Sequence, residues 1–118
     1  MEWNVIALPE CRLQVTPNRF RIPDVMLIPR SQKVDRIVRE APLLCIEVLS
    51  PEDTWAKRRA RLNDYLAMGV EHVWCFDPDA REARRFTATG FVVASEPTLT
   101  VSGTPIVISI TEVFSVLD

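Results

Sequence analysis

The 118-residue sequence contains only three cysteines, three glycines and one histidine, His72. The cysteines, Cys11, Cys45 and Cys75, are far apart, and no two have the close spacing of a zinc site. Because each lies among apolar neighbours, we expect buried, reduced thiols in a cytoplasmic protein. One histidine cannot supply a histidine-rich metal site, so we expect His72 at the surface or at a strand edge rather than as a ligand.

Long apolar runs and an excess of one charge are also missing. The longest apolar stretch is far below the roughly 18 residues of a membrane span, and no basic segment of a secretory signal opens the chain. The net charge of −2 argues against a uniformly basic DNA binder but leaves room for a local basic face. With 47% apolar and 25% charged residues, the composition predicts one globular domain over residues 1–118, with no membrane contact.

Short apolar runs separated by proline and turn residues predict several strands. They cover residues 3–8, 12–15, 21–28, 43–49 and 70–77, then a hairpin of 82–87 and 90–94, and a last strand over 104–110. A short C-terminal helix is expected over 111–117. The pattern predicts a mixed α/β domain with a sheet of about five to seven strands, in which residues 70–77 return parallel to 43–49.

One long helix is predicted between the two parallel strands. Residues 50–53 (Ser-Pro-Glu-Asp) combine a capping hydroxyl, a proline and acids, which is typical of a helix start, although Asp53 could itself be the cap. The helix is expected to end at Gly69. Helical spacing places Trp55 on the apolar face, so we expect it, with Tyr65 and Trp74, in the core rather than as a platform for nucleobases.

Glu47 is an anomaly in the apolar run of residues 43–49, because an unpaired buried carboxylate costs several kcal/mol. Asp24 is a second acid, in the predicted strand over 21–28. Either acid could be purely structural, accepting backbone N–H groups or pairing with an arginine. Two carboxylates on adjacent strands, together with a backbone carbonyl, would also form an oxygen-rich site suited to Mg²⁺. Such a metal activates water and stabilises charge on a phosphate.

These residues carry a resemblance to a known family. The matching segments are Pro23-Asp24, Ile46-Glu47-Val48-Leu49-Ser50-Pro51, Tyr65, Gly69-Val70, Val73-Trp74 and Asp77-Pro78. Together they resemble the Uma family of putative restriction endonucleases, part of the PD-(D/E)xK nuclease superfamily. The resemblance implies a restriction-endonuclease-like mixed β-sheet core flanked by helices. It also implies a Mg²⁺-dependent endonuclease, with Mn²⁺ as a substitute, that hydrolyses DNA phosphodiester bonds by metal-activated water.

By the same resemblance, Asp24 and Glu47 would hold the metal, and the Val48 carbonyl would complete the site. The lysine of the superfamily usually lies two residues after the glutamate, where this sequence has Leu49. In the Uma family the basic residue is instead expected on the following helix. The resemblance therefore leaves the catalytic cation to be supplied by that helix.

Two basic residues of the helix are candidates for this cation. Arg61 lies four residues before the tyrosine, at the position that the resemblance indicates, and Lys57 lies one turn earlier. An arginine neutralises a phosphate but cannot readily exchange a proton, so Lys57 could substitute for it. Alternatively, both are solvated side chains that pair with nearby acids. We expect one of them to reach the site.

The resemblance also leaves two other functions open. Family members usually begin with a helical segment before the first strand, so this chain resembles an N-terminally truncated member, and Arg58 lies where the family tends to have an apolar residue. One alternative is a catalytically inactive nuclease-fold protein that binds nucleic acid or a partner chain. The other is an oligomerising scaffold in which the acids are structural. An open sheet edge would favour a homo-oligomer.

Overall fold

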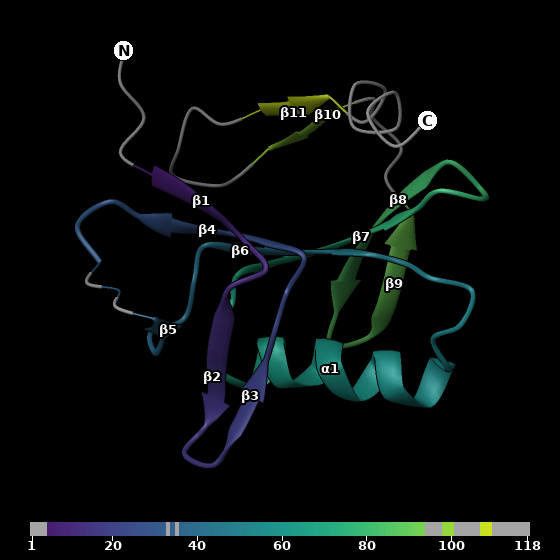
Figure 1. Cartoon of the computed structure of the whole chain (residues 1–118). Coiled ribbons are helices and arrows are strands. Elements are labelled where there is room, and N and C mark those ends of the chain that lie inside the picture. The colour runs from purple at the N-terminus through teal and green to yellow at the C-terminus, as the bar shows by residue number, and fades with distance from the viewer. Residues whose placement is uncertain (1–4, 33, 35, 94–97, 101–106, 110–118) are drawn as a thin grey trace.

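The computed structural model describes residues 5–32, 34, 36–93, 98–100 and 107–109, and its centre is one six-stranded sheet (Figure 1). The strand order is β1-β4-β6-β7-β8-β9. Their bounds are β1 Val5–Pro9, β4 Val25–Pro29, β6 Leu44–Val48, β7 His72–Asp77, β8 Glu82–Thr87 and β9 Gly90–Val93. Within this sheet, β6 and β7 are the one parallel pair, and the other neighbouring strands pair antiparallel. The predicted mixed sheet, the parallel return and the β8–β9 hairpin are confirmed.

The helix α1 (Trp55–Ala67) connects the two parallel strands. Its N-cap is Thr54, whose side chain accepts a hydrogen bond from the backbone N–H three residues later. The expected start at Ser50 or Asp53 is therefore wrong, because these residues close a separate turn through an Asp53 N–H to Ser50 O bond of 3.1 Å. The predicted end is confirmed, with Gly69 at φ +98°, where a side chain would be strained.

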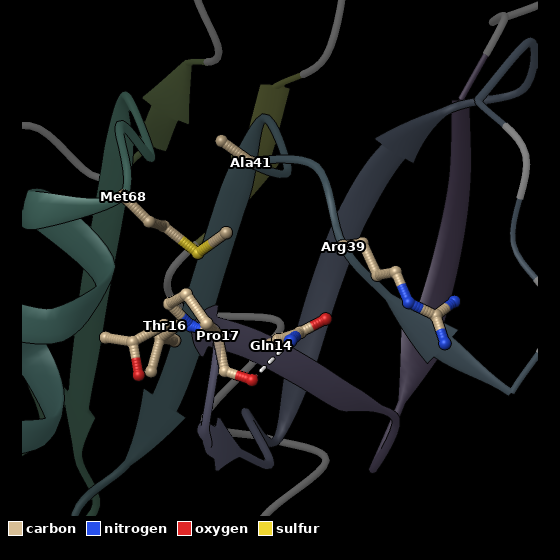
Figure 2. A pocket seen from close by; sticks show the side chains of 7 residues that line it. Gln14, Thr16, Pro17, Arg39, Ala41 and Met68 are labelled. Carbon is tan, nitrogen blue, oxygen red and sulfur yellow. Dashed lines mark hydrogen bonds between the residues drawn. The ribbon is translucent and has the colours of Figure 1, made fainter.

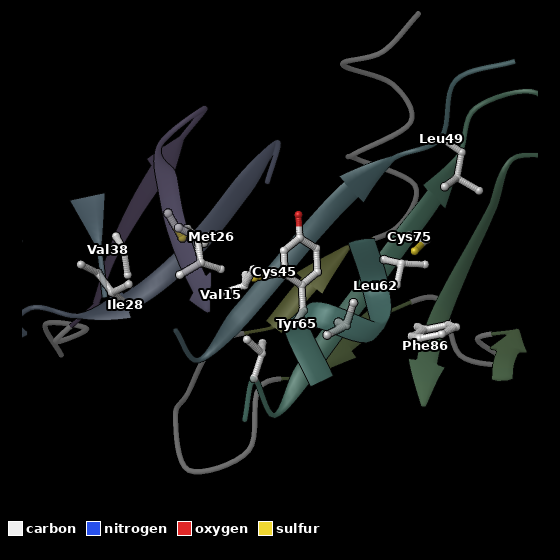
Figure 3. Close-up of a cluster of buried hydrophobic side chains, with 13 residues drawn as sticks. Val15, Met26, Ile28, Val38, Cys45, Leu49, Leu62, Tyr65, Cys75 and Phe86 are labelled. Carbon is white, nitrogen blue, oxygen red and sulfur yellow. The ribbon is translucent and has the colours of Figure 1, made fainter. Parts of the chain in front are cut away.

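Alternating side chains of the central strands build two apolar clusters, one on each face of the sheet. The cluster beneath α1 contains Leu62 and Tyr65 of the helix together with Cys45 and Cys75 of the sheet (Figure 3). The cluster on the other face contains Leu27, Leu44, Trp74, Phe76, Ala83 and Leu99. Leu99 comes from β10 (Thr98–Thr100), which pairs antiparallel with β11 (Val107–Ser109). The alternation places the odd-numbered side chains of β6, including Glu47, on the helix side.

A second, three-stranded sheet packs beside the main one. Its strands are β2 (Arg12–Thr16), β3 (Arg19–Arg21) and β5 (Ile37–Val38), in the order β3-β2-β5. The strand predicted over 21–28 is confirmed from Val25 onward, as β4, but its expected start is wrong, because Arg21 ends β3 and a break separates the two strands. Pro23 at the break has no N–H to donate, and the Asp24 carboxylate accepts the backbone N–H of Val48 at 2.6 Å.

At its C-terminal end, the chain matches the prediction only in part. The strand expected over 104–110 corresponds to β11, which covers three residues, and β10 was not predicted because it is equally short. The helix expected over 111–117 lies outside the described residues. Within the described part of the chain, no helix is long and apolar enough to span a membrane.

Two side chains occupy environments opposite to those expected. His72 is 8% exposed, because β7 is an internal strand, and its ring meets that of Trp74 edge-on. Burial lowers the pKa of His72. Trp55 is 49% exposed, because it begins α1 and packs on Phe91 of the edge strand β9 rather than on the central strands.

The cysteines are close to expectation. Cys45 and Cys75 are buried free thiols, and Cys11 is a free thiol that is only half-buried. Burial raises the pKa of Cys75 to about 12, with the nearby Glu47 carboxylate adding to the effect. A thiol with such a pKa stays protonated at neutral pH and is chemically inert.

Candidate active site

Strand register brings Asp24 and Glu47 together. β4 pairs antiparallel with β6, with Val25 opposite Ile46. The next position along this register therefore places Asp24 opposite Glu47, although Asp24 itself lies just before β4. Both residues belong to the positions that face α1. Two carboxylates 23 positions apart in the chain become cross-strand neighbours at the end of β6.

Glu47 lies under the helix with only 4% of its surface exposed. Its Oε1 accepts a hydrogen bond of 2.5 Å from the hydroxyl of Tyr65, which extends from α1 toward the sheet (Figure 3). Arg61, one helical turn before Tyr65, places its Nε 3.4 Å from the same oxygen. This contact is an ion pair rather than a hydrogen bond, since the Arg61 Nε has no hydrogen-bond acceptor among the described residues.

Arg61 is held on its other side by Asp53. Its guanidinium donates to Asp53 Oδ2 at 2.6 Å, from the turn that precedes the helix. Arg58, one turn earlier, donates to the carbonyl of Ser50 at 3.1 Å and lies 3.7 Å from the same Asp53 oxygen. Arg58, which occupies a position where the family tends to have an apolar residue, therefore closes the turn between β6 and α1. The guanidinium of Arg61 bridges the half-buried Asp53 and the buried Glu47.

The two candidate cations differ in position. Arg61 is half-buried and contacts Glu47, whereas Lys57 is exposed on α1 and makes no side-chain contact with the carboxylates among the described residues. Arg61 is thus the basic side chain that the fold brings to the acids. Arg61 also pairs with a nearby acid, as the alternative prediction for the helix cations had it, because its guanidinium donates to Asp53.

The protonation of Glu47 follows from these contacts. Burial raises the pKa of Glu47 from 4.5 to about 7, although the Tyr65 hydrogen bond and the Arg61 charge both lower it. The neighbouring Asp24 carboxylate raises it further. The hydrogen bond from Arg61 holds the pKa of Asp53 below its usual value. Burial and the charge of Glu47 raise the pKa of Tyr65, so this hydroxyl remains a donor.

The two acids keep capacity for a further ligand. The backbone N–H of Val48 engages Oδ2 of Asp24 and the Tyr65 hydroxyl engages Oε1 of Glu47, and in its protonated form Glu47 also hydrogen-bonds to the Asp24 carboxylate. Ionisation of Glu47 would release this shared hydrogen bond and free carboxylate oxygens for a cation. Carboxylate oxygens are the ligands that Mg²⁺ prefers. A bound cation would also stabilise the ionised form of Glu47, whose pKa shows that its negative charge is incompletely compensated. The donor set therefore fits a hard divalent cation. No third Asp, Glu, His or Cys joins the pair within the described residues, so further ligands would be carbonyls or water.

Sequence reasoning missed the roles of three residues around the pair. Tyr65 was expected only as a core residue, but its hydroxyl also contacts Glu47 directly. Asp53 was expected in the helix start, and Arg58 had no assigned contact. The available signal was spacing: positions 54, 58, 61 and 65 fall on one helical stripe, which follows the glutamate after a short turn.

A surface depression elsewhere does not involve the carboxylates. It has a volume of about 410 Å³ and lies between β2, the approach to β6 and the end of α1 (Figure 2). The Gln14 amide on its wall donates to the Pro17 carbonyl at 3.0 Å, so it is satisfied within the protein. None of the candidate site residues lines this depression.

Comparison with known proteins identifies the class of fold. A crystal structure of a putative nuclease belonging to DUF820 from Anabaena variabilis ATCC 29413 superposes with a TM-score of 0.78 at 23% sequence identity. The match covers 98% of this chain and 70% of the other. The mixed sheet with its crossing helix is accordingly a restriction-endonuclease-like fold. No curated protein matches the chain. The family model of Uma2, described as putative restriction endonuclease, matches residues 3–113, and the chain belongs to this family.

Proposed function

We propose that this protein is a Mg²⁺-dependent endonuclease that hydrolyses DNA phosphodiester bonds, with Asp24 and Glu47 as the metal ligands. The observation that carries the proposal is the cross-strand pair itself. Two acids from adjacent strands lie within hydrogen-bond reach of each other, beside an arginine, in a fold of the nuclease class.

The pair has the charge balance of a binding site rather than of a finished ion pair. Arg61 lies 3.4 Å from Glu47 Oε1, but its shorter contact, 2.6 Å, is with Asp53. The Tyr65 hydrogen bond and the Arg61 charge alone would lower the pKa of this acid below its ordinary value, but burial and the neighbouring Asp24 carboxylate outweigh them. The pKa of Glu47 is instead about 7. A site of this kind gains free energy when a cation arrives.

Each residue of the candidate site has a role in this proposal. Asp24 and Glu47 would hold Mg²⁺, and the Val48 carbonyl is the further oxygen ligand that we propose. A bound Mg²⁺ supplies activation of water and neutralisation of phosphate charge. The Tyr65 hydroxyl fixes Oε1 of Glu47 and so orients its second oxygen. The guanidinium of Arg61 stabilises the negative charge that accumulates on the phosphate.

Of the two candidate cations, we propose Arg61 and assign Lys57 to the surface. Arg61 contacts Glu47 and is positioned by Asp53, whereas Lys57 is exposed. Because an arginine keeps its proton, its contribution is electrostatic, and the proton of the attacking water must leave to solvent or to another group.

The alternative function is a catalytically inactive nuclease-fold protein that binds nucleic acid. The observation that favours it is the hydrogen-bonded network of Arg58, Arg61 and Asp53, which stabilises the turn before α1 even when no metal is bound. In this alternative Arg61 is a permanent structural partner of the acids, and Mg²⁺ has no high-affinity site.

Cleavage of supercoiled plasmid and of linear duplex DNA in Mg²⁺, in Mn²⁺ and in EDTA tests the proposal. We expect metal-dependent nicking that Glu47→Gln and Asp24→Asn each reduce by at least about 100-fold, as for loss of a principal electrostatic group. Arg61→Ala should slow cleavage strongly, and Lys57→Ala should leave it within about twofold. Arg61→Lys tests whether charge alone suffices.

The matched control is Glu71→Gln, the same chemical change at an acid that is 62% exposed in its side chain, just before β7 begins. Isothermal titration with Mn²⁺ supplies a readout independent of cleavage. Saturable binding that disappears in Glu47→Gln but persists in Glu71→Gln supports the metal site. Absence of binding in the unmodified protein contradicts it and favours the inactive alternative.

A further inference from the structure

Trp55 is exposed where α1 begins. Half of its surface, 49%, is accessible, and its ring centroid lies 5.3 Å from that of Phe91. Phe91 in turn lies 5.0 Å from Phe86. These spacings are those of packed aromatic pairs, so the inner rings hold the indole in place while leaving part of it uncovered. Fixed, accessible aromatic rings are typical of binding surfaces.

Helical periodicity adds two polar groups beside this indole. Trp55, Arg59 and Asn63 are four residues apart on α1 and therefore form one stripe. This stripe differs from the one that carries Arg61 toward the carboxylates. The side chains of Arg59 and Asn63 are exposed, and neither forms a hydrogen bond or ion pair with another described residue. A cation and an amide are thus available to a ligand.

The stripe and the β8–β9 hairpin enclose a pocket. Its volume is about 230 Å³, and its walls include Trp55, Arg59 and Asn63 of the helix and Gly90 and Phe91 of the hairpin. A side chain built at Gly90 would meet nothing within 4 Å, so the pocket is open there. The volume is below the roughly 300–1,000 Å³ of sites for drug-sized ligands. It suits a single planar ring system.

We propose that this pocket binds one unpaired nucleobase of a DNA strand, stacked on Trp55. Stacking accepts any base, since every base has a π face. The Asn63 amide can pair with a base edge, and the Arg59 guanidinium can pair with the adjoining phosphate. The inference deepens the proposed function, because it rests on DNA as the substrate.

The pocket and the candidate active site share the helix α1. Six residues of helix separate Trp55 from Arg61, which is about 9 Å along the axis. The two side chains also leave the helix about 120° apart around its axis, because they belong to different stripes. A strand that contacts both residues must therefore pass around α1. The protein would then prefer DNA with a single-stranded, frayed or mismatched segment over an intact duplex.

Fluorescence anisotropy of a labelled oligothymidylate with the full chain in EDTA tests the pocket without any cleavage. We expect Trp55→Ala to weaken binding about 5- to 150-fold, the range for loss of one stacked base. Trp55→Phe should retain most of the affinity, because it keeps an aromatic face. Arg59→Gln should weaken binding and reduce its salt dependence. The oligothymidylate should also quench tryptophan fluorescence in the unmodified protein and less so in Trp55→Phe.

The matched control is Phe20→Ala, which removes a 37%-exposed aromatic ring on the β2–β3 hairpin, beneath Arg12. This variant should bind like the unmodified protein. Unchanged affinity in Trp55→Ala, or an equal loss for a perfectly paired duplex, overturns the inference. Because Trp55→Phe and Arg59→Gln leave the core intact, they keep the test decisive if Trp55→Ala unfolds.

The proposed function and the pocket fail independently. Loss of base binding in Trp55→Ala without any metal-dependent cleavage by the unmodified protein would retain the pocket and refute the nuclease proposal. If Glu47→Gln abolishes cleavage and Trp55→Ala binds oligothymidylate like the unmodified protein, the nuclease proposal is retained and the pocket is refuted.

Discussion

Replacing Glu47 by Gln should stabilise the metal-free protein at alkaline pH. The pKa of Glu47 is about 7 in the fold against 4.5 ordinarily. Ionising this side chain in the native state therefore costs about 3 kcal/mol, at 1.36 kcal/mol per pH unit. Gln has no charge to bury, can still accept the Tyr65 hydrogen bond, and leaves Arg61 with its partner Asp53.

The sign of the pH dependence follows from proton linkage. Because the folded-state pKa is raised, the native protein binds more protons than the unfolded chain between about pH 4.5 and pH 7. The Glu47 contribution to the free energy of unfolding therefore falls as pH rises through this window and is constant above it. Between pH 5 and pH 8 the unmodified protein should lose about 2.5 kcal/mol relative to Glu47→Gln.

Urea unfolding, followed by circular dichroism in EDTA at unit steps from pH 5 to pH 8, measures this difference. Glu71→Gln, with its exposed side chain, should show no such trend. The reasoning is refuted if Glu47→Gln is destabilised by about 3–5 kcal/mol at pH 8, which is the cost of removing one member of a fully compensated buried ion pair. A difference that does not vary with pH would equally contradict the raised pKa.

Three further predictions concern the same network. Tyr65→Phe removes the donor to Glu47 and should destabilise the protein by about 1.5–3 kcal/mol at pH 8, with a smaller loss at pH 5, as urea unfolding would show. Asp53→Asn should cost about 1 kcal/mol at neutral pH, and Glu52→Gln close to nothing. Because the pKa of Asp53 is lowered, its contribution to the free energy of unfolding is fully present above the ordinary pKa of 3.8 and disappears as pH falls through the folded-state pKa. The free energies of unfolding of the unmodified protein and of Asp53→Asn should therefore converge in acid. If Glu47 must be ionised to bind metal, Mn²⁺ affinity measured by calorimetry should fall about tenfold per pH unit below pH 7 and level off above it; affinity independent of pH would exclude Glu47 as a ligand.

The sequence determined most of the main sheet and the end of the helix. Apolar runs bounded by proline and turn residues located β1, β2, β6, β7 and the β8–β9 hairpin, because a local pattern of burial is sufficient to identify such strands. Gly69 marked the end of α1 for an equally local reason, its tolerance of a left-handed conformation. Glu47 was conspicuous because a charge inside an apolar run requires an explanation.

The surroundings of the Glu47 carboxylate depended on the tertiary structure. Which cation reaches Glu47 follows from the rotation of α1 about its axis, which the cap at Thr54 and the packing of Tyr65 fix. Sequence spacing alone left Lys57 and Arg61 equivalent, since they lie one turn apart on the same stripe.

The predictions from sequence were wrong where contacts between residues distant in the chain override the local pattern of apolar and polar residues. Trp55 has the spacing of a core residue, but the edge strand against which it packs leaves half of it uncovered. His72 is polar, but its strand lies between two others, so it is buried. Asp24 lies at a break in a predicted strand, because its carboxylate binds a backbone N–H of β6. Burial and pairing are properties of neighbours brought together by folding. The sequence could therefore identify the acids, and only the tertiary structure could decide what surrounds them.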